Sequence, residues 1–308
     1  MNALDVLPRL YDLGRLMYPE PTLRNWKKRL VLFGTGVGSL QEFRGWFGGI
    51  ATNAPLAAAL ERFPLVQGAL YWPYIHKDWP RDRRLAAIDG HYRLLDGHAA
   101  ILAQGVNHDI ELLRLDEQYM GLRLVLDKAI WFLREGESVL NIFHGDQRLY
   151  SAAFTLGIEG GERVAYLGTL QGSNQENAME MYRQMTQTLH GLRPRDLMMV
   201  ALKLFCEAID VHRIWAISGT ARQHNSAYFG DSKKDKVLQN FDEVWLEHDG
   251  ADLGNGFFEI QAVVRYRDVA DIPSKKRASY RRRYQFLDEL AVQIRHACTR
   301  HAARGQAG

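Results

Sequence analysis

The sequence has little cysteine, no long apolar run and no strong excess of either charge. The 308 residues include two cysteines, Cys206 and Cys298, which excludes a disulfide-stabilised scaffold; both lie in amphipathic helical patterns and are expected to be packing residues. No stretch approaches the roughly 18 apolar residues of a membrane-spanning helix, and the N-terminus lacks the apolar core of a signal peptide. We therefore expect a cytoplasmic protein.

Charge is nearly balanced, with 39 basic and 36 acidic residues, so the whole chain gives no argument for nucleic acid as a partner. The sequence also lacks a Walker loop, a dinucleotide-binding fingerprint, a Gly-x-Ser-x-Gly elbow and the ligand spacing of a zinc site. We therefore expect no metal and no prosthetic group. Any electrostatic function must be local.

The first hundred residues predict a helical region, 1–100. Apolar residues recur there at helical spacing, as in Leu56, Leu60 and Phe63, with turn residues between the runs. An aromatic segment, LYWPYIHKDWP at 70–80, follows these residues. Its rings are expected either to belong to the core or to line a groove.

Residues 101–308 are expected to form an α+β core with a C-terminal helix. Short apolar-rich runs between 108 and 172 predict consecutive antiparallel strands. The later patterns predict helices at 177–191 and 193–210, strands at 212–218, 241–249 and 256–266, a charged surface loop at 230–240, and a helix after Ser274. The fold class is therefore α+β: a helical N-terminal region, then a mixed, mainly antiparallel sheet with packed helices.

A set of segments resembles the VirK/YbjX family, a bacterial family of unknown function. In chain order they are HYRLL at 91–95, YLGTLQG at 166–172, LHGLRPRDL at 189–197, IWAIS at 214–218, FDEVWLE at 241–247 and PSKKRASYRRRY at 273–284. The resemblance covers most of the chain and is weakest at its N-terminal end. It implies an association with virulence, with resistance to cationic antimicrobial peptides and with envelope or stress responses. It carries over no catalytic residue.

The segment GTLQG at 168–172 is expected to form a turn between a strand and a helix. Gly168 and Gly172 permit positive φ angles and close approach of backbone amides to a ligand, and Gln171 lies between them. A helix that begins soon afterwards would direct its N-terminal dipole at a phosphate or carboxylate. These three residues are candidates for binding the phosphates of coenzyme A, and a tight turn without a ligand is the alternative.

Arg193 and Arg195 bracket Pro194, which suits the first turn of a helix. Two guanidinium groups beside free helix N–H groups would form an anion site, so both arginines are candidates for holding a thioester donor. The alternative is that they pair with Asp196, Asp210 or another carboxylate.

The order of elements resembles the acyl-CoA-binding core of the GNAT acetyltransferase superfamily, in which pantetheine wedges between two splayed strands. Here the strands would be 163–172 and 212–218. The sequence departs from that superfamily, because Asn174 stands where its phosphate loop has a glycine and an extra helix at 177–190 intervenes. The resemblance implies acyl transfer from acyl-CoA, or a similar thioester, to an amine or hydroxyl on a small molecule, peptide or lipid.

Acyl transfer to an amine needs a base, and the thiolate leaving group needs an acid. His224 and Tyr228, just after the strand at 212–218, are candidates for these roles. Glu247 or Asp242 could orient a partner or act as the base. The alternatives are a surface histidine and a packed tyrosine.

The C-terminal helix begins with a basic segment, 275–283. It is expected either to be a solvated face paired with acidic loops or to contact an anionic ligand, for example as a peripheral membrane contact. The competing hypothesis for the whole chain is a non-catalytic accessory factor for envelope stress and antimicrobial-peptide resistance. Such a factor would bind partners through this segment and the aromatic segment at 70–80.

Overall fold

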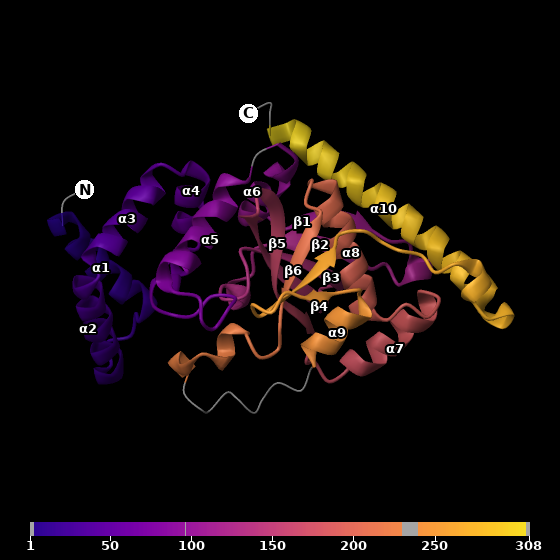
Figure 1. Ribbon diagram of the computed structural model, residues 1–308, viewed down its shortest axis with the longest axis horizontal. Helices are drawn as coiled ribbons and strands as arrows, with labels where there is room; N and C mark the ends of the chain where they lie inside the picture. Colours follow the sequence, from indigo (N-terminus) through magenta and orange to yellow (C-terminus); the bar gives the residue numbers. More distant parts are fainter. Residues whose placement is uncertain (1–2, 96, 230–239, 306–308) are drawn as a thin grey trace.

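The computed structural model describes residues 3–95, 97–229 and 240–305. A central sheet separates two groups of helices: the helices between residues 3 and 93 lie on one side, and α8 (Pro194–Ala208) and α10 (Arg277–Gly305) lie on the other (Figure 1). The expected surface loop at 230–240 falls almost entirely outside the described residues.

The N-terminal region is helical, as the sequence predicts. Two of its helices begin with side-chain caps: the Thr22 hydroxyl accepts from Asn25 N at 3.2 Å, and Asn53 Oδ1 accepts from Leu56 N at 3.3 Å. The helices are α1 (Ala3–Met17), α2 (Leu23–Gly38), α3 (Leu40–Ala51), α4 (Ala54–Arg62), α5 (Arg81–Arg93) and α6 (Ala100–Asn107).

The sheet has eight strands in the order β1-β2-β3-β4-β5-β6-β8-β7. β5 and β6 pair in parallel, and the other neighbours pair antiparallel. This confirms the predicted mixed, mainly antiparallel sheet. The strands are β1 (Ile110–Arg114), β2 (Arg123–Asp127), β3 (Ser138–His144), β4 (Gln147–Glu159), β5 (Glu162–Gly172), β6 (Arg213–Ile217), β7 (Ala251–Asp252) and β8 (Phe257–Gln261).

Alternation along the strands divides the core between the two sheet faces. Leu140 and Ile142 of β3 belong to the large cluster with α8 and α10, whereas Val139 lies in a small cluster with Phe132. Tyr166 of β5 packs with the N-terminal helices. Each face of the sheet therefore buries its own apolar side chains.

A buried polar network joins the N-terminal helices to the sheet. Glu137 Oε2 lies 2.6 Å from Lys128 Nζ and accepts from the Tyr92 hydroxyl at 2.8 Å. The Tyr74 hydroxyl donates to Glu137 Oε1 at 3.1 Å and bonds with Thr155 Oγ1. Tyr74 of the aromatic segment and Tyr92 of α5 thus both bind the Glu137 carboxylate beside β3. Tyr74 is fully buried, so this ring belongs to the core.

Three predicted elements differ from the structure. The segment FDEVWLE was expected to be a strand, but it is α9 (Phe241–Glu247), because Asn240 caps it and Phe241, Val244 and Trp245 are buried at helical spacing. The predicted turn at 168–172 is the end of β5, which pairs with β4 as far as Gly172. The strand expected at 256–266 ends at Gln261.

Candidate functional site

Arg148, near the start of β4, belongs to a polar group on the sheet face opposite α8 and α10. Its Nη2 donates to Asp127 Oδ2 at 2.6 Å, and its Nη1 donates to Asn141 Oδ1. The Ser151 hydroxyl donates to the same Asn141 oxygen at 2.7 Å, and Asn141 Nδ2 donates to two strand carbonyls. Because β2 and β3 supply the two partners of the guanidinium, and Ser151 of β4 bonds to one of them, Arg148 is held in place by the sheet itself.

Two aromatic rings flank the Arg148 guanidinium. Its central carbon lies 5.0 Å from the ring centroid of Trp131 and 4.9 Å from that of Phe143. Such cation–π contacts are worth about 0.5–1 kcal/mol at exposed sites. Trp131 is 62% exposed, so much of its ring surface remains accessible to a ligand.

A cavity of about 540 Å³ opens beside Arg148. Its size falls within the range of roughly 300–1,000 Å³ that small-molecule sites occupy. The lining comes from the residue before β1, η4 (Ile130–Phe132), the β3–β4 hairpin and the end of β5 with the loop after it. It includes Asp109, Trp131, Phe143, Asp146, Arg148, Tyr150, Gln171, Gly172 and Asn174.

The cavity carries more negative than positive charge. Asp109 and Asp146 line it together with Arg148, and Asp127 lies against Arg148. Burial raises the pKa of Asp127, the ion pair with Arg148 opposes that rise, and the charge of Asp109 adds to it. Asp127 Oδ1 is buried and has no hydrogen-bond partner among the described residues. A ligand with a cationic or hydrogen-donating group would balance these carboxylates.

Of the glycine-turn candidates, Gln171 and Gly172 line this cavity and Gly168 does not. A Cβ atom at Gly168 would overlap the Glu135 carbonyl group, so the glycine serves close packing of two backbones. Gln171 is exposed at the cavity, at the end of a strand where the sequence predicts a turn.

The structure places Arg193 and Arg195 in an ion-pair cluster away from the cavity lining. Arg193 Nε donates to Asp196 Oδ2 at 2.7 Å and Arg193 Nη2 to Glu247 Oε2 at 2.9 Å, and Arg195 pairs with the same Glu247 oxygen. His248 Nε2 lies 3.5 Å from Asp196 Oδ1. Pro194 begins α8, as predicted, but both arginines pair with carboxylates, which is the alternative interpretation.

His224 and Tyr228 lie in two short turns that follow β6, η5 (Gln223–Asn225) and η6 (Ala227–Phe229). Tyr228 is 48% exposed, and its ring contacts Phe229 at a centroid distance of 5.0 Å. Neither residue lines the cavity, and Glu247 lies with the two arginines. The structure therefore does not bring the three predicted proton-handling residues to the cavity.

The strands expected to splay apart are hydrogen-bonded neighbours. β5 and β6 pair from Val164 with Arg213 to Leu167 with Ala216, which is almost the whole length of β6. Just beyond the paired stretch, Arg222 Nη2 donates to the Thr169 hydroxyl at 3.0 Å. A thioester arm would need a gap between these two strands, and their pairing leaves none along this stretch. The pairing therefore does not support the resemblance to the acetyltransferase superfamily.

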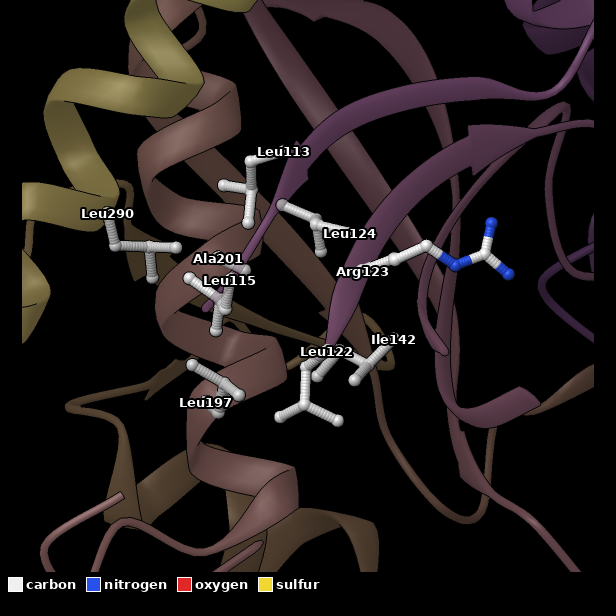
Figure 2. Close-up of a pocket in the computed structure, with 9 residues that line it drawn as sticks. All are labelled: Leu113, Leu115, Leu122, Arg123, Leu124, Ile142, Leu197, Ala201 and Leu290. Atoms are coloured by element: carbon white, nitrogen blue, oxygen red, sulfur yellow. The ribbon is translucent and has the colours of Figure 1, made fainter. Parts of the chain in front are cut away.

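A second cavity lies between the sheet and the helices α8 and α10, and it is apolar (Figure 2). Leucines from β1, β2, α8 and α10 converge on it, while the Arg123 guanidinium extends away from them (Figure 2). Its volume is about 20 Å³, room for a single water, and an apolar lining gives a water no partners. We regard it as a packing defect.

The remaining expectations concern metals, thiols and membrane spans. Among the described residues, no three His, Cys, Asp or Glu side chains form a group that could hold a metal ion. Within those same ranges, no helix is both long and apolar enough to cross a bilayer. Cys206 and Cys298 are buried free thiols, which agrees with the predicted packing roles.

The basic segment 275–283 is only partly available to a ligand. Arg277 Nε donates to the Ile272 carbonyl at 3.0 Å, and Arg283 Nη2 donates to the His190 carbonyl at 2.7 Å. These two arginines anchor the start of α10. Lys275 and Lys276 are exposed, so contact with an anionic surface through them stays a prediction.

Comparison with known proteins identifies the family. A family model described as a protein of unknown function, DUF535, matches residues 21–296. The chain belongs to this family. YbjX of Escherichia coli K12, an uncharacterized protein, is 29% identical to the DUF535 chain over 258 residues, 81% of this chain and 77% of YbjX. This confirms the resemblance to the VirK/YbjX family.

Two uncharacterized proteins of Haemophilus influenzae Rd also match the DUF535 chain. One is 29% identical over 162 residues and the other 32% identical over 160 residues. Each match covers 52% of this chain and 52% of the relative, so the chain spans about half the length of either relative.

Sequence reasoning missed the Arg148 group of the DUF535 chain. Its partners Asp127, Asn141 and Ser151 come from three strands, and their proximity depends on strand register. One signal was present: each is a polar residue within a run whose neighbours predict burial. A buried polar residue requires a partner, so these positions could have been flagged.

Proposed function

We propose that this protein is a binding protein whose ligand carries a cationic or amine group and occupies the Arg148 cavity. One observation supports this above the others: Asp109 and Asp146 line the cavity, and the guanidinium in its lining, that of Arg148, is already paired with the buried Asp127. Exposed Trp131 would bind a planar or cationic portion of the ligand through its ring.

This proposal develops the alternative of a non-catalytic accessory factor. An association with resistance to cationic antimicrobial peptides, implied by the family resemblance, is compatible with a site that prefers positive charge. Acyl transfer is the narrower proposal: the bound amine would be the acceptor and an acyl-CoA the donor. It requires a second site for the donor, since Arg193 and Arg195 are paired with Asp196 and Glu247.

A matched pair of ligands tests the sign of charge that the cavity prefers. Tryptamine and indole-3-acetate share the indole ring and differ in carrying an ammonium or a carboxylate group. We expect tryptamine to bind in calorimetric titration and to raise the melting temperature by mass action, with indole-3-acetate weaker. The Asp146→Asn variant should bind tryptamine about fivefold more weakly, because one charge is lost near the ligand. The control is Glu207→Gln, which removes an exposed carboxylate on α8 that does not line the cavity.

The contrary results are equally specific. Stronger binding of indole-3-acetate would contradict the proposal and favour the anion site that the sequence predicts at Gln171 and Gly172. Equal, weak binding of both ligands, unchanged in Asp146→Asn, would remove the cavity as a binding site. Acetyl-CoA is titrated separately: the acyltransferase version requires that it raise the melting temperature and acetylate a bound amine.

A further inference from the structure

Helix α2 presents an apolar stripe to solvent. Its large apolar side chains with exposed fractions from 43% to 75% are Leu23, Trp26, Leu30, Val31 and Val37. At 3.6 residues per turn, positions 23, 26, 30 and 37 share one face, and buried Leu32 and Gly36 lie on the opposite face. A helix on a protein surface normally exposes polar residues to solvent, so this exposed apolar stripe requires an explanation.

The flanks of the stripe are cationic. Arg24 and Lys27 are exposed, and the sequence from 23 to 38 contains no Asp or Glu. Lys28 lies on the side of α2 away from the stripe, with its Nζ 4.8 Å from the centroid of the Tyr18 ring. Arg29 is used differently: its Nε donates to the Tyr18 carbonyl at 2.8 Å and ties α2 to the end of α1. The exposed side of α2 therefore combines apolar contact area with positive charge that no acidic residue of the helix itself balances.

Charge decides which partner fits this surface. A second copy of the chain, related by a twofold axis through the stripe, would place Lys27 of one copy near the same cation of the other. An anionic lipid surface instead offers negative charge to the cations and an apolar interior to the stripe. α2 lies at the outer end of the helical region, away from the sheet and α10, so a flat surface can approach it (Figure 1).

We propose that α2 binds the surface of an anionic lipid bilayer, with its axis parallel to the membrane plane. Leu23, Trp26 and Leu30 enter the boundary between head groups and acyl chains, and Lys27, on the same side of the helix, contacts a lipid phosphate. The contact needs no change in the fold, because the side chains involved are already exposed. This inference is independent of the Arg148 cavity, which lies on the sheet.

Sedimentation with vesicles tests the proposal. The full chain is mixed with vesicles of phosphatidylcholine alone, or of phosphatidylcholine with phosphatidylglycerol, at low and at high salt. We expect sedimentation with the anionic vesicles at low salt and a marked loss at high salt. Leu30→Gln should weaken binding about tenfold through lost apolar burial, and Lys27→Gln about fivefold through lost charge. Both positions are exposed, so both variants should fold, which melting curves check.

A double variant of the basic segment, Lys275→Gln with Lys276→Gln, is the matched control. It removes two exposed cations from the far side of the molecule and should bind vesicles like the unchanged chain. Loss of binding in this control but not in Leu30→Gln would overturn the proposal and place the contact at α10. Absence of sedimentation with anionic vesicles would overturn it too. A dimer in light scattering that Leu30→Gln dissociates, without vesicle binding, would assign the stripe to a second copy.

Discussion

Gly168 on β5 packs directly against the backbone of Glu135, and a Cβ atom at this glycine would overlap the Glu135 carbonyl oxygen. Glu135 lies in the loop between β2 and β3, and Gln223 Nε2 donates to its carboxylate at 2.8 Å. The pair therefore brings together the loop after η4, the bend in β5 and the segment that follows β6. Gly168 is a packing position in the middle of this junction.

Substitution of Gly168 should be costly. In Gly168→Ala the neighbour that must move is backbone, which cannot rotate away, so we expect a loss of stability of about 2–4 kcal/mol in chemical denaturation. The control is Gly45→Ala in α3, where no atom lies within 4 Å of the added carbon. Alanine is the better helix former, so this variant should gain about 0.5–1 kcal/mol. If Gly168→Ala were as stable as the unchanged chain, the close packing would be wrong.

Asp196 should make stability depend on pH in the acid range. Burial raises the pKa of Asp196, but the hydrogen bond with His248 and the ion pair with Arg193 outweigh burial and lower it to about 2. An acid with a lowered pKa in the folded state contributes stability above its unfolded pKa, and that contribution is lost as the pH falls toward 2. Asp196→Asn should therefore cost about 2 kcal/mol at pH 7 and progressively less below pH about 4.

Urea denaturation at a series of pH values measures this effect. The control, Glu207→Gln at the exposed end of α8, should show no comparable change between pH 7 and acid. A cost of Asp196→Asn that stays constant across the series would mean that the carboxylate is not bound by its neighbours. The same experiment reports whether the cluster of Arg193, Arg195 and Glu247 stabilises the fold.

Helices and strands could be predicted from the sequence where a regular pattern of apolar residues extends over many positions. The β3–β4 hairpin and α8 follow from apolar runs bounded by turn residues, and Pro194 at the first turn of α8 follows from proline chemistry. α9 was misread because seven residues give barely two turns, and its apolar positions also suit an alternating strand. Gly168 was interpreted as a turn residue because a close approach by Glu135, distant in sequence, leaves no local signal.

The candidate site was harder to predict than the fold. Gln171 and Gly172 do line the cavity, but Arg148 and its acidic neighbours come together only through pairing of β2, β3 and β4. Local sequence cannot show whether an arginine meets a ligand or a carboxylate. Arg193 illustrates this, since its partner Glu247 lies 54 residues away in the chain.

Arg148 should control the charge state of Asp127, and this gives the sharpest test of the cavity. In Arg148→Met the Asp127 carboxylate keeps its burial but loses its cation, so we expect a loss of about 3 kcal/mol at neutral pH. Burial already raises the pKa of Asp127, and removing Arg148 removes the group that opposes this rise. An acid with a raised folded pKa loses stability as the pH rises from its unfolded pKa to its folded pKa, so the cost of Arg148→Met should be larger at pH 8 than at pH 5.

The second variant, Arg148→Met with Asp127→Asn, separates this charge effect from lost packing. It removes the buried carboxylate, so the difference between pH 8 and pH 5 should disappear while any cost from the contacts with Trp131 and Phe143 remains. Denaturation at both pH values, for both variants, measures the two contributions. A cost of Arg148→Met that is independent of pH would show that Asp127 is screened by solvent, and the negative charge available to a cation in the cavity would then come from Asp109 and Asp146 alone.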